Sequence, residues 1–258
     1  MSLIGTRRAW LRALLYGGPP LVAGYAFGIE PRRLRERRLR LSDRPTVRFA
    51  YFTDLHFKGD PRLLNRVVSR LRAMRPEFAL FGGDLVEKAD HLDAALEALG
   101  RAGLPIFGVP GNHDYWSGSD FDRIGEALRR TGGDWLLDAS ARVPVGAGRG
   151  HVRVNGHTCQ TDVVLPPEPN QKNFALIHYP KWVERLPVGY DLILAGHSHG
   201  GQVRLPFFGA LAKPSGVGRY EWGRYDTPAG PLYVSSGIGT FHLNVRFLCP
   251  PELVWIDA

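Results

Sequence analysis

Short apolar runs separated by amphipathic stretches make up the first half of the chain. The runs Val47–Phe52, Phe78–Phe81 and Leu104–Val109 are too short for helices and predict buried strands. Apolar residues recurring every three or four positions predict helices over Pro61–Met74, Asp90–Arg101 and Phe121–Arg130. Asp60 is a typical capping residue, and proline is favoured at the first position of a helix. This strand–helix order predicts an α/β fold in which helices pack on a sheet.

The second half of the chain is richer in predicted strands. Asn155-Gly156 has the residue types of a tight hairpin turn, and the Gly- and Pro-containing stretches Pro166–Asn170 and Leu205–Gly218 predict loops. No internal repeat and no linker divides residues 47–258, which we expect to form one domain. The predicted strands are Val152–Val154, Asp162–Leu165, Phe174–His178, Leu192–Ala195, Gln202–Leu205, Leu232–Val234 and Leu253–Ile256.

Residues 1–29 have the pattern of a bacterial export signal. The run from Thr6 through Arg7-Arg8 to Arg12 resembles the twin-arginine (Tat) consensus, and an uncharged apolar stretch, Ala13–Ile29, follows it. This stretch has 17 residues, the lower limit for a membrane span, and contains Gly and Pro. We interpret residues 1–29 as a Tat-like signal or membrane anchor; the alternative is a frayed amphipathic tail.

The net positive charge of the chain lies beside this apolar stretch. Residues 1–48 contain 11 arginines and 3 acidic residues, a balance of +8 that equals the net charge of the whole chain. The remaining residues hold 22 basic and 22 acidic side chains. Because a nucleic-acid-binding domain carries its basic surface within its folded body, we expect no nucleic-acid partner.

Residues 30–46 form a basic lead-in segment to the domain. Its arginines suit contact with anionic lipid headgroups. The alternation of Leu39 and Leu41 with arginines also fits a short edge strand, and the two interpretations are compatible. We therefore expect a membrane-associated protein, periplasmic or extracytoplasmic if the Tat-like signal is used and otherwise on the cytoplasmic face of the inner membrane.

The number of cysteines narrows the class of protein. Cys159 and Cys249 are the two cysteines in the chain. Two thiols exclude a disulfide-built scaffold and a cysteine-based zinc cluster, and they allow one disulfide at most. No apolar run is long enough for a protein with several membrane spans.

Polar residues gather where the predicted strands end. The carboxyl ends of strands in an open α/β sheet meet at one rim, where sites form. Because residues i and i+2 of an extended segment point the same way, Asp54 with His56, and His197 with His199, can each bind one ion together. The clusters are Asp54-Leu55-His56, Gly83-Asp84, Gly111-Asn112-His113-Asp114, His178 and Gly196-His197-Ser198-His199-Gly200-Gly201.

Seven oxygen and nitrogen donors in these clusters exceed the three or four that one catalytic ion takes. They suit two ions if one carboxylate bridges them. Carboxylate and imidazole without thiolate favour cations of the Mn, Fe or Zn class. Each cluster alone has an alternative as a cap, a turn or a core histidine, but their joint order at successive strand ends favours a metal site. The candidate ligands are Asp54, His56, Asp84, Asn112, His178, His197 and His199.

These motifs, in this order, resemble the signature of the calcineurin-like metallophosphoesterases, from about residue 47 to the C-terminus. The resemblance implies a four-layer α/β/β/α sandwich with a dinuclear site at the strand ends. It implies that His113 contacts the substrate phosphate and protonates the leaving oxygen, oriented by Asp114. It also implies a first ion on Asp54, His56 and His199, and a second on Asn112, His178 and His197, with Asp84 bridging.

Further features resemble one bacterial branch of that superfamily. Gly200-Gly201-Gln202, the Pro250-Pro251-Glu252 tail and the apolar N-terminus are similar to those of membrane-associated phosphodiesterases and UDP-diacylglucosamine pyrophosphatases. The resemblance implies hydrolysis of a phosphodiester or pyrophosphate in a lipid-linked or membrane-associated substrate. The alternatives are the same chemistry on a soluble nucleotide-type substrate and a non-catalytic scaffold. Phe207-Phe208 fits either a wall of an acyl or nucleoside pocket or an ordinary loop anchor.

Overall fold

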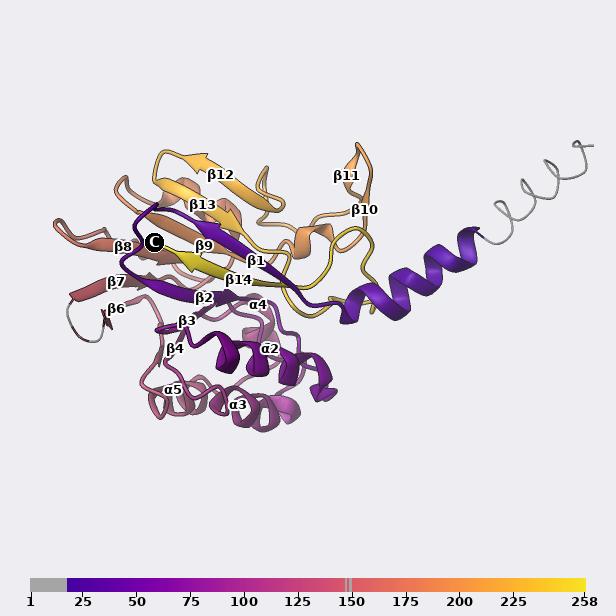
Figure 1. Cartoon of the computed structure of the whole chain (residues 1–258), viewed down its shortest axis with the longest axis horizontal. Helices are drawn as coiled ribbons and strands as arrows, with labels where there is room; N and C mark the ends of the chain where they lie inside the picture. Colours follow the sequence, from indigo (N-terminus) through magenta and orange to yellow (C-terminus); the bar gives the residue numbers. More distant parts are fainter. Residues whose placement is uncertain (1–17, 147, 149) are drawn as a thin grey trace, which may run out of the picture.

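Two six-stranded sheets lie face to face in the computed structural model, which describes residues 18–146, 148 and 150–258 (Figure 1). The first sheet has the order β1 (Arg35–Arg40), β14 (Glu252–Asp257), β2 (Arg48–Phe52), β3 (Ala79–Phe81), β4 (Ile106–Gly108) and β5 (Asp134–Trp135). The second has the order β12 (Gly223–Thr227), β13 (Gly230–Val234), β9 (Leu192–Ala195), β8 (Lys172–Leu176), β7 (Gly150–Gly156) and β6 (Ala139–Val145).

The parallel strands of each sheet end at a common edge. In the first sheet β2, β3, β4 and β5 are parallel, and β14 runs antiparallel to β2. In the second sheet β7, β8, β9 and β13 are parallel. The carboxyl ends within each parallel set therefore share one edge of their sheet, as the sequence predicts.

Three helices cover the outer face of the first sheet, namely α2 (Pro61–Met74), α3 (Leu92–Gly100) and α5 (Phe121–Arg129). The Asp60 carboxylate accepts from the backbone N–H of Arg62, and Pro61 opens α2, as predicted. Phe49, Phe78 and Phe174 pack against one another between the sheets. The 3-10 helix η4 (Pro180–Arg185) and loops cover the second sheet. The predicted α/β class is confirmed, with a 3-10 helix in the fourth layer.

Two predictions for the second half of the chain are wrong. Asp162–Leu165 is not a strand, because β7 already pairs with β6 on one side and β8 on the other. Asn155-Gly156 is not a turn but the end of β7. The Asn155 amide donates to the carbonyls of Leu165 and Pro166, so tertiary contacts stabilise it within a strand.

The predicted edge strand is present as β1, which pairs in parallel with β14. Before it, residues 18–24 form a helix, followed by the π-helical turn η1 (Tyr25–Ile29) and the 3-10 turn η2 (Glu30–Arg32). The twin arginine Arg7-Arg8 lies outside the described residues. Within the described part of the chain, no helix has both the length and the apolar character needed to span a bilayer.

Candidate metal centre

All seven predicted ligands lie at the ends of strands and are buried. Asp54 and His56 follow β2, and Asp84 follows β3. The remaining ligands are Asn112, which begins the short helix α4 (Asn112–Trp116) after β4, His178 after β8, and His197 and His199 after β9. Both sheets therefore contribute ligands to one buried cluster.

Left-handed backbone turns, not extended strands, bring the ligands together. The φ angles are 54° at Asp54, 39° at His56, 60° at Asp84, 64° at His197 and 49° at His199. Such a conformation costs a non-glycine residue roughly 1–2 kcal/mol. Interstrand hydrogen bonds maintain it, since the Asp54 N–H donates to the Gly83 carbonyl at 2.8 Å and the His56 N–H to the Asp84 carbonyl at 3.0 Å. The predicted convergence is present, but the extended-strand reason for it is wrong.

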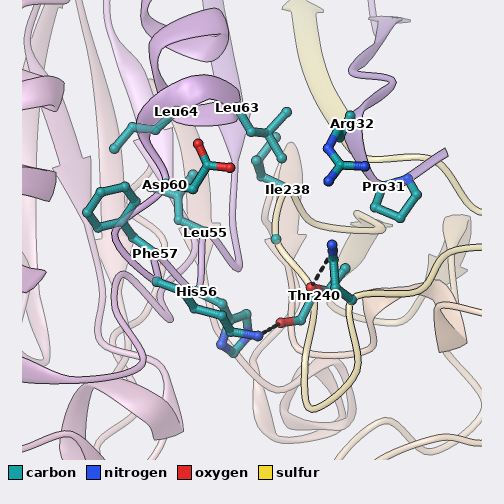
Figure 2. Close-up of a pocket in the computed structure, with 13 residues that line it drawn as sticks. Pro31, Arg32, Leu55, His56, Phe57, Asp60, Leu63, Leu64, Ile238 and Thr240 are labelled. Carbon is teal, nitrogen blue, oxygen red and sulfur yellow. Dashed lines mark hydrogen bonds between the residues drawn. The ribbon is translucent and has the colours of Figure 1, made fainter. Parts of the chain in front are cut away.

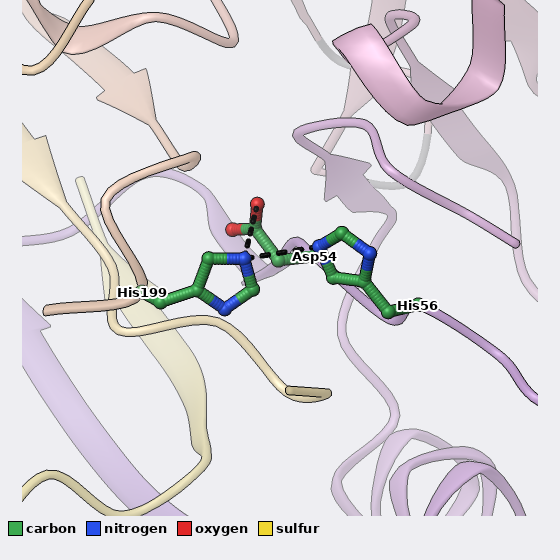
Figure 3. Close-up of side chains that lie close together, drawn as sticks. All are labelled: Asp54, His56 and His199. Carbon is green, nitrogen blue, oxygen red and sulfur yellow. Dashed lines mark hydrogen bonds and ion pairs between the residues drawn. The ribbon is translucent and has the colours of Figure 1, made fainter. Parts of the chain in front are cut away.

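Asp54, His56 and His199 form the first group, with ligand atoms within 4.8 Å of one another. Figure 3 shows their side chains pointing toward a common centre. His56 Nε2 lies 3.0 Å from His199 Nε2, and His199 Nε2 lies 3.8 Å from Asp54 Oδ1. This is the trio assigned to the first ion from the sequence.

Asp84, His178 and His197 form the second group, also within 4.8 Å. Asn112 Oδ1 lies 3.1 Å from His178 Nε2 and so adjoins this group. Asp84 Oδ2 lies 3.3 Å from His178 Nε2 and 3.4 Å from His56 Nε2. The Asp84 carboxylate thus lies between the two groups, the position that a bridging ligand requires.

Backbone groups fix the orientation of several ligands. The Asp54 carboxylate accepts from the His197 N–H at 2.9 Å. His178 Nδ1 lies 2.7 Å from the Gly82 carbonyl, and His197 Nε2 lies 2.7 Å from the Ser215 carbonyl. Because each of these carbonyls accepts a hydrogen bond from one ring nitrogen, the other nitrogen of that ring is available as a ligand.

Burial shifts the pKa of several ligands in the cluster away from its usual value. It raises the pKa of Asp54, and it lowers the pKa of His199 and that of His197, the latter to about 3. At His178 burial opposes the charge, but attraction to Asp84 raises the pKa to about 9. Carboxylate and imidazole donors held together in this way suit divalent cations, and the residues are compatible with binding them.

His113 adjoins the first group, with its ring centroid 4.6 Å from that of His56. Its backbone N–H donates to Asp84 Oδ1 at 2.8 Å. Burial opposes the charged ring, but the hydrogen bond to Glu87 and the attraction of Asp84 raise the pKa of His113. This shift favours the protonated form of the imidazole that lies beside the ligand cluster.

Asp114 does not make the predicted contact with His113. Its carboxylate accepts from the backbone N–H groups of Asp84, Leu85 and Gly111, each at 2.8 Å. Burial and repulsion by Asp84 raise the pKa of Asp114 to about 6. In this position Asp114 stabilises the backbone that carries the bridging carboxylate.

Glu87 is the carboxylate beside the His113 ring, and the sequence reasoning missed it. Its Oε2 lies 3.4 Å from His113 Nδ1, and its Oε1 lies 2.6 Å from His56 Nδ1. These two imidazoles lower the pKa of Glu87, although burial opposes the charge. The signal in the sequence is a carboxylate three residues beyond Asp84, in the segment that follows the same strand.

Two cavities flank the ligand cluster. One, of about 240 Å³, extends from His56 to α2 and to Pro31 and Arg32 of the N-terminal segment (Figure 2). The other, of about 320 Å³, lies beside His199 and is lined mainly by apolar groups, among them Phe241 and Leu243. Phe207 and Phe208 do not line either cavity.

Comparison with known proteins identifies the family. Residues 47–201 match the calcineurin-like phosphoesterase family. The chain belongs to this family. It is therefore a metal-dependent phosphoric ester hydrolase, and its fold agrees with the one that the sequence motifs imply.

Individual relatives are distant but cover most of the chain. The uncharacterized metallophosphoesterase YkuE of Bacillus subtilis is 26% identical over an alignment of 256 positions that covers 89% of this chain and 87% of YkuE. The phosphodiesterase YaeI of Escherichia coli is 26% identical over an alignment of 217 positions that covers 80% of each chain. Among solved structures, TT1561 of Thermus thermophilus aligns with a TM-score of 0.48 and 13% identity, covering 75% of this chain and 90% of that one.

Proposed function

We propose that this phosphoesterase uses two divalent cations to hydrolyse a phosphodiester or pyrophosphate bond in a lipid-linked or membrane-associated substrate. The position of the Asp84 carboxylate, 3.3 Å from His178 and 3.4 Å from His56, carries the proposal of two ions. The name of the relative YaeI, a phosphodiesterase, supports the type of bond.

The ligands divide between the ions as the two buried groups divide. Cations of the Mn, Fe or Zn class, when bound, would activate water and polarise phosphoryl oxygens. Asp84 would serve both ions, because its carboxylate lies between the groups. Asp54, His56 and His199 would hold the first ion, and Asn112, His178 and His197 would hold the second.

His113 donates the proton to the leaving oxygen. Its Nδ1 faces Glu87, so Nε2 is the atom that carries the proton toward the substrate. Glu87 is the residue that orients the ring, and Asp114 acts through the backbone of Asp84. His113 keeps the catalytic role assigned from the sequence, whereas the orienting role assigned to Asp114 passes to Glu87 and Asp114 positions Asp84.

Hydrolysis of bis-p-nitrophenyl phosphate by purified, Mn-loaded protein tests the enzyme against the scaffold alternative. We expect turnover in the parent. His113→Gln, which retains the metal ligands, should lose about 10²- to 10⁴-fold on diesters with basic leaving groups and much less on this substrate, because p-nitrophenolate leaves with little need of a proton. Val188→Ser, which changes a side chain that is 76% exposed just before the amino end of β9, is the control for general disruption. Metal-loaded protein without turnover would favour a scaffold.

The proposal of a lipid-linked substrate depends on the apolar cavity of about 320 Å³ beside His199. This cavity suits an acyl chain better than a charged nucleotide. A UDP-diacylglucosamine-type pyrophosphate, a lipid phosphodiester and a cyclic nucleotide distinguish the candidates. Higher kcat/KM on either lipid supports the proposal. Preference for the nucleotide would favour the soluble-substrate alternative.

We also propose that residues 1–29 direct the domain to a membrane through the Tat-like Arg7-Arg8 pair. Replacing both arginines with lysine should retain the protein in the cytoplasm while leaving hydrolysis in vitro unchanged, because every proposed ligand lies after residue 53. Fractionation of cells expressing either form measures this. An intact parent protein found entirely in the soluble fraction would contradict the anchor.

A further inference from the structure

The small hairpin β10 (Arg204–Leu205) and β11 (Gly209–Ala210) exposes an apolar tip that the catalytic assignment leaves unused. Phe207 is 106% exposed and Phe208 is 84% exposed. Leu205 and Leu211 beside them are also exposed. Adjacent phenylalanines that contribute nothing to the core indicate a contact outside the chain.

The backbone at the tip is strained to hold this arrangement. Phe207 has a φ of 69°, a conformation that costs a bulky residue roughly 1–2 kcal/mol. Among the described residues, Phe207 makes no ring contact that would offset this cost. Strain that gives no internal contact is typical of functional surfaces.

Two neighbouring segments extend the apolar tip into a continuous rim. A β-bridge joins Val203, at the base of the hairpin, to Phe247 in the loop that contains exposed Leu243 and Leu248. The Phe247 ring contacts the Tyr25 ring, with centroids 6.4 Å apart, next to exposed Phe27 of the N-terminal helix. Figure 1 shows the hairpin and this helix at the same end of the molecule. We call these three segments the apolar rim.

The apolar rim borders the cavity beside His199 at Leu243. Leu243 both lines that cavity and is exposed, so the cavity opens onto the rim. Ten of the sixteen exposed large apolar side chains among the described residues belong to the rim's three segments. This concentration distinguishes the rim from the scattered apolar side chains of an ordinary surface.

Charge and shape favour a lipid bilayer as the occupant. Exposed Arg32 and Lys58 line the neighbouring cavity, and exposed Lys213 lines the cavity mouth in an ion pair with Glu221, so cations border the rim. A hairpin tip of four apolar side chains offers much less than the roughly 800 Å² that each partner buries in a stable protein interface. A narrow apolar tip bordered by cations instead suits insertion among anionic headgroups.

We propose that the apolar rim inserts into the interfacial layer of an anionic bilayer, with the mouth of the metal centre facing the membrane. The hairpin and the loop with Leu243 and Leu248 add to the anchor proposed in residues 1–29, whose described end contributes the third segment of the rim. The inference rests on the proposed function only in giving a lipid-linked substrate a direct path from the bilayer to the cavity beside His199.

Sedimentation with vesicles of phosphatidylcholine and phosphatidylglycerol tests the rim in the full chain. Phe207→Ser/Phe208→Ser should partition at least about tenfold less onto the vesicles, because two aromatic side chains leave the lipid. Phe207→Leu/Phe208→Leu should retain most of the binding. Val188→Ser removes a side chain that is 76% exposed, just before the amino end of β9, and should bind as the parent does.

Hydrolysis of bis-p-nitrophenyl phosphate, measured in the same preparations, separates this inference from the proposed function. Weaker vesicle binding with unchanged hydrolysis supports the docking surface. Unchanged vesicle binding in the serine variant overturns it while leaving the phosphoesterase intact. A parent that self-associates in sedimentation velocity, through Phe207 and Phe208 and without vesicle binding, also overturns it, because a second copy would then cover the rim.

Discussion

Replacing Arg246 with Met should destabilise the fold beneath the metal centre. Arg246 is fully buried, and its guanidinium donates to the carbonyls of Ser236, Gly237, Gly239 and Cys249 at distances between 2.6 and 3.3 Å. Burial lowers its pKa, but arginine stays charged at neutral pH. One side chain therefore satisfies four carbonyls of a single loop.

The size of the effect follows from what Met leaves behind. Each buried carbonyl without a donor costs about 1–3 kcal/mol, and entry of water offsets part of that sum. Removing one member of a buried charged network costs about 3–5 kcal/mol, which we expect for the loss in unfolding free energy. Arg246→Lys keeps the charge but supplies one donor nitrogen, so it should lose roughly half as much.

The same substitution should weaken one metal group more than the other. Gly237 packs so closely on Asp54 that a Cβ at this position would lie 2.8 Å from the Asp54 Cβ. A displaced loop would therefore disturb the group of Asp54, His56 and His199 first. Elemental analysis during stepwise chelation should show earlier loss of one ion from the variant.

Urea unfolding of the metal-free protein measures the stability difference directly, from the midpoint at constant slope. Arg72→Met, at an exposed position on α2, is the matched control and should change stability by less than about 0.5 kcal/mol. An unfolding free energy of Arg246→Met within about 1 kcal/mol of the parent value would refute the reasoning, because the four carbonyls would then have other hydrogen-bond partners.

Three further predictions concern single side chains. Asp84→Ala should lose both ions in elemental analysis, because it removes the carboxylate between the groups; full occupancy would contradict the bridging role. Glu87→Gln should retain metal and lose rate in proportion to the basicity of the leaving group, as His113→Gln does; an equal loss on all leaving groups would exclude orientation of a general acid. Burial lowers the pKa of His157 to about 4 in the folded protein. In the unfolded protein His157 binds a proton at higher pH, so the free energy of unfolding falls as the pH drops below about 6.5. Between pH 7 and 5 the unfolding free energy of the parent, measured with urea, should fall by about 2 kcal/mol more than that of His157→Gln. The same pH dependence of unfolding free energy in both proteins would contradict this.

The order of the strands and the ligands could be predicted from the sequence because both depend on local pattern. Apolar runs such as Leu192–Ala195 form the strands that they predict, and β9 has these same bounds. The polar residues that follow such a run must leave the sheet at its carboxyl end, so His197 and His199 reach that edge whatever backbone conformation they adopt. For this reason the predicted ligands lie together in the structure, although the sequence did not predict the left-handed turns.

The residues that the sequence did not reveal act through partners far along the chain. Glu30 carries no local signal, yet its carboxylate is buried and accepts from the backbone N–H of Leu248 at 3.0 Å. Cys249, the next residue, donates from its thiol to the carbonyl of His199 at 3.3 Å. A residue of the basic lead-in segment is thus linked through one loop to a metal ligand, a connection that requires the folded chain. Ala26 is connected in the same way, because its carbonyl accepts from the backbone N–H of Arg246 at 2.9 Å, so both Ala26 and Glu30 belong to the support of the centre.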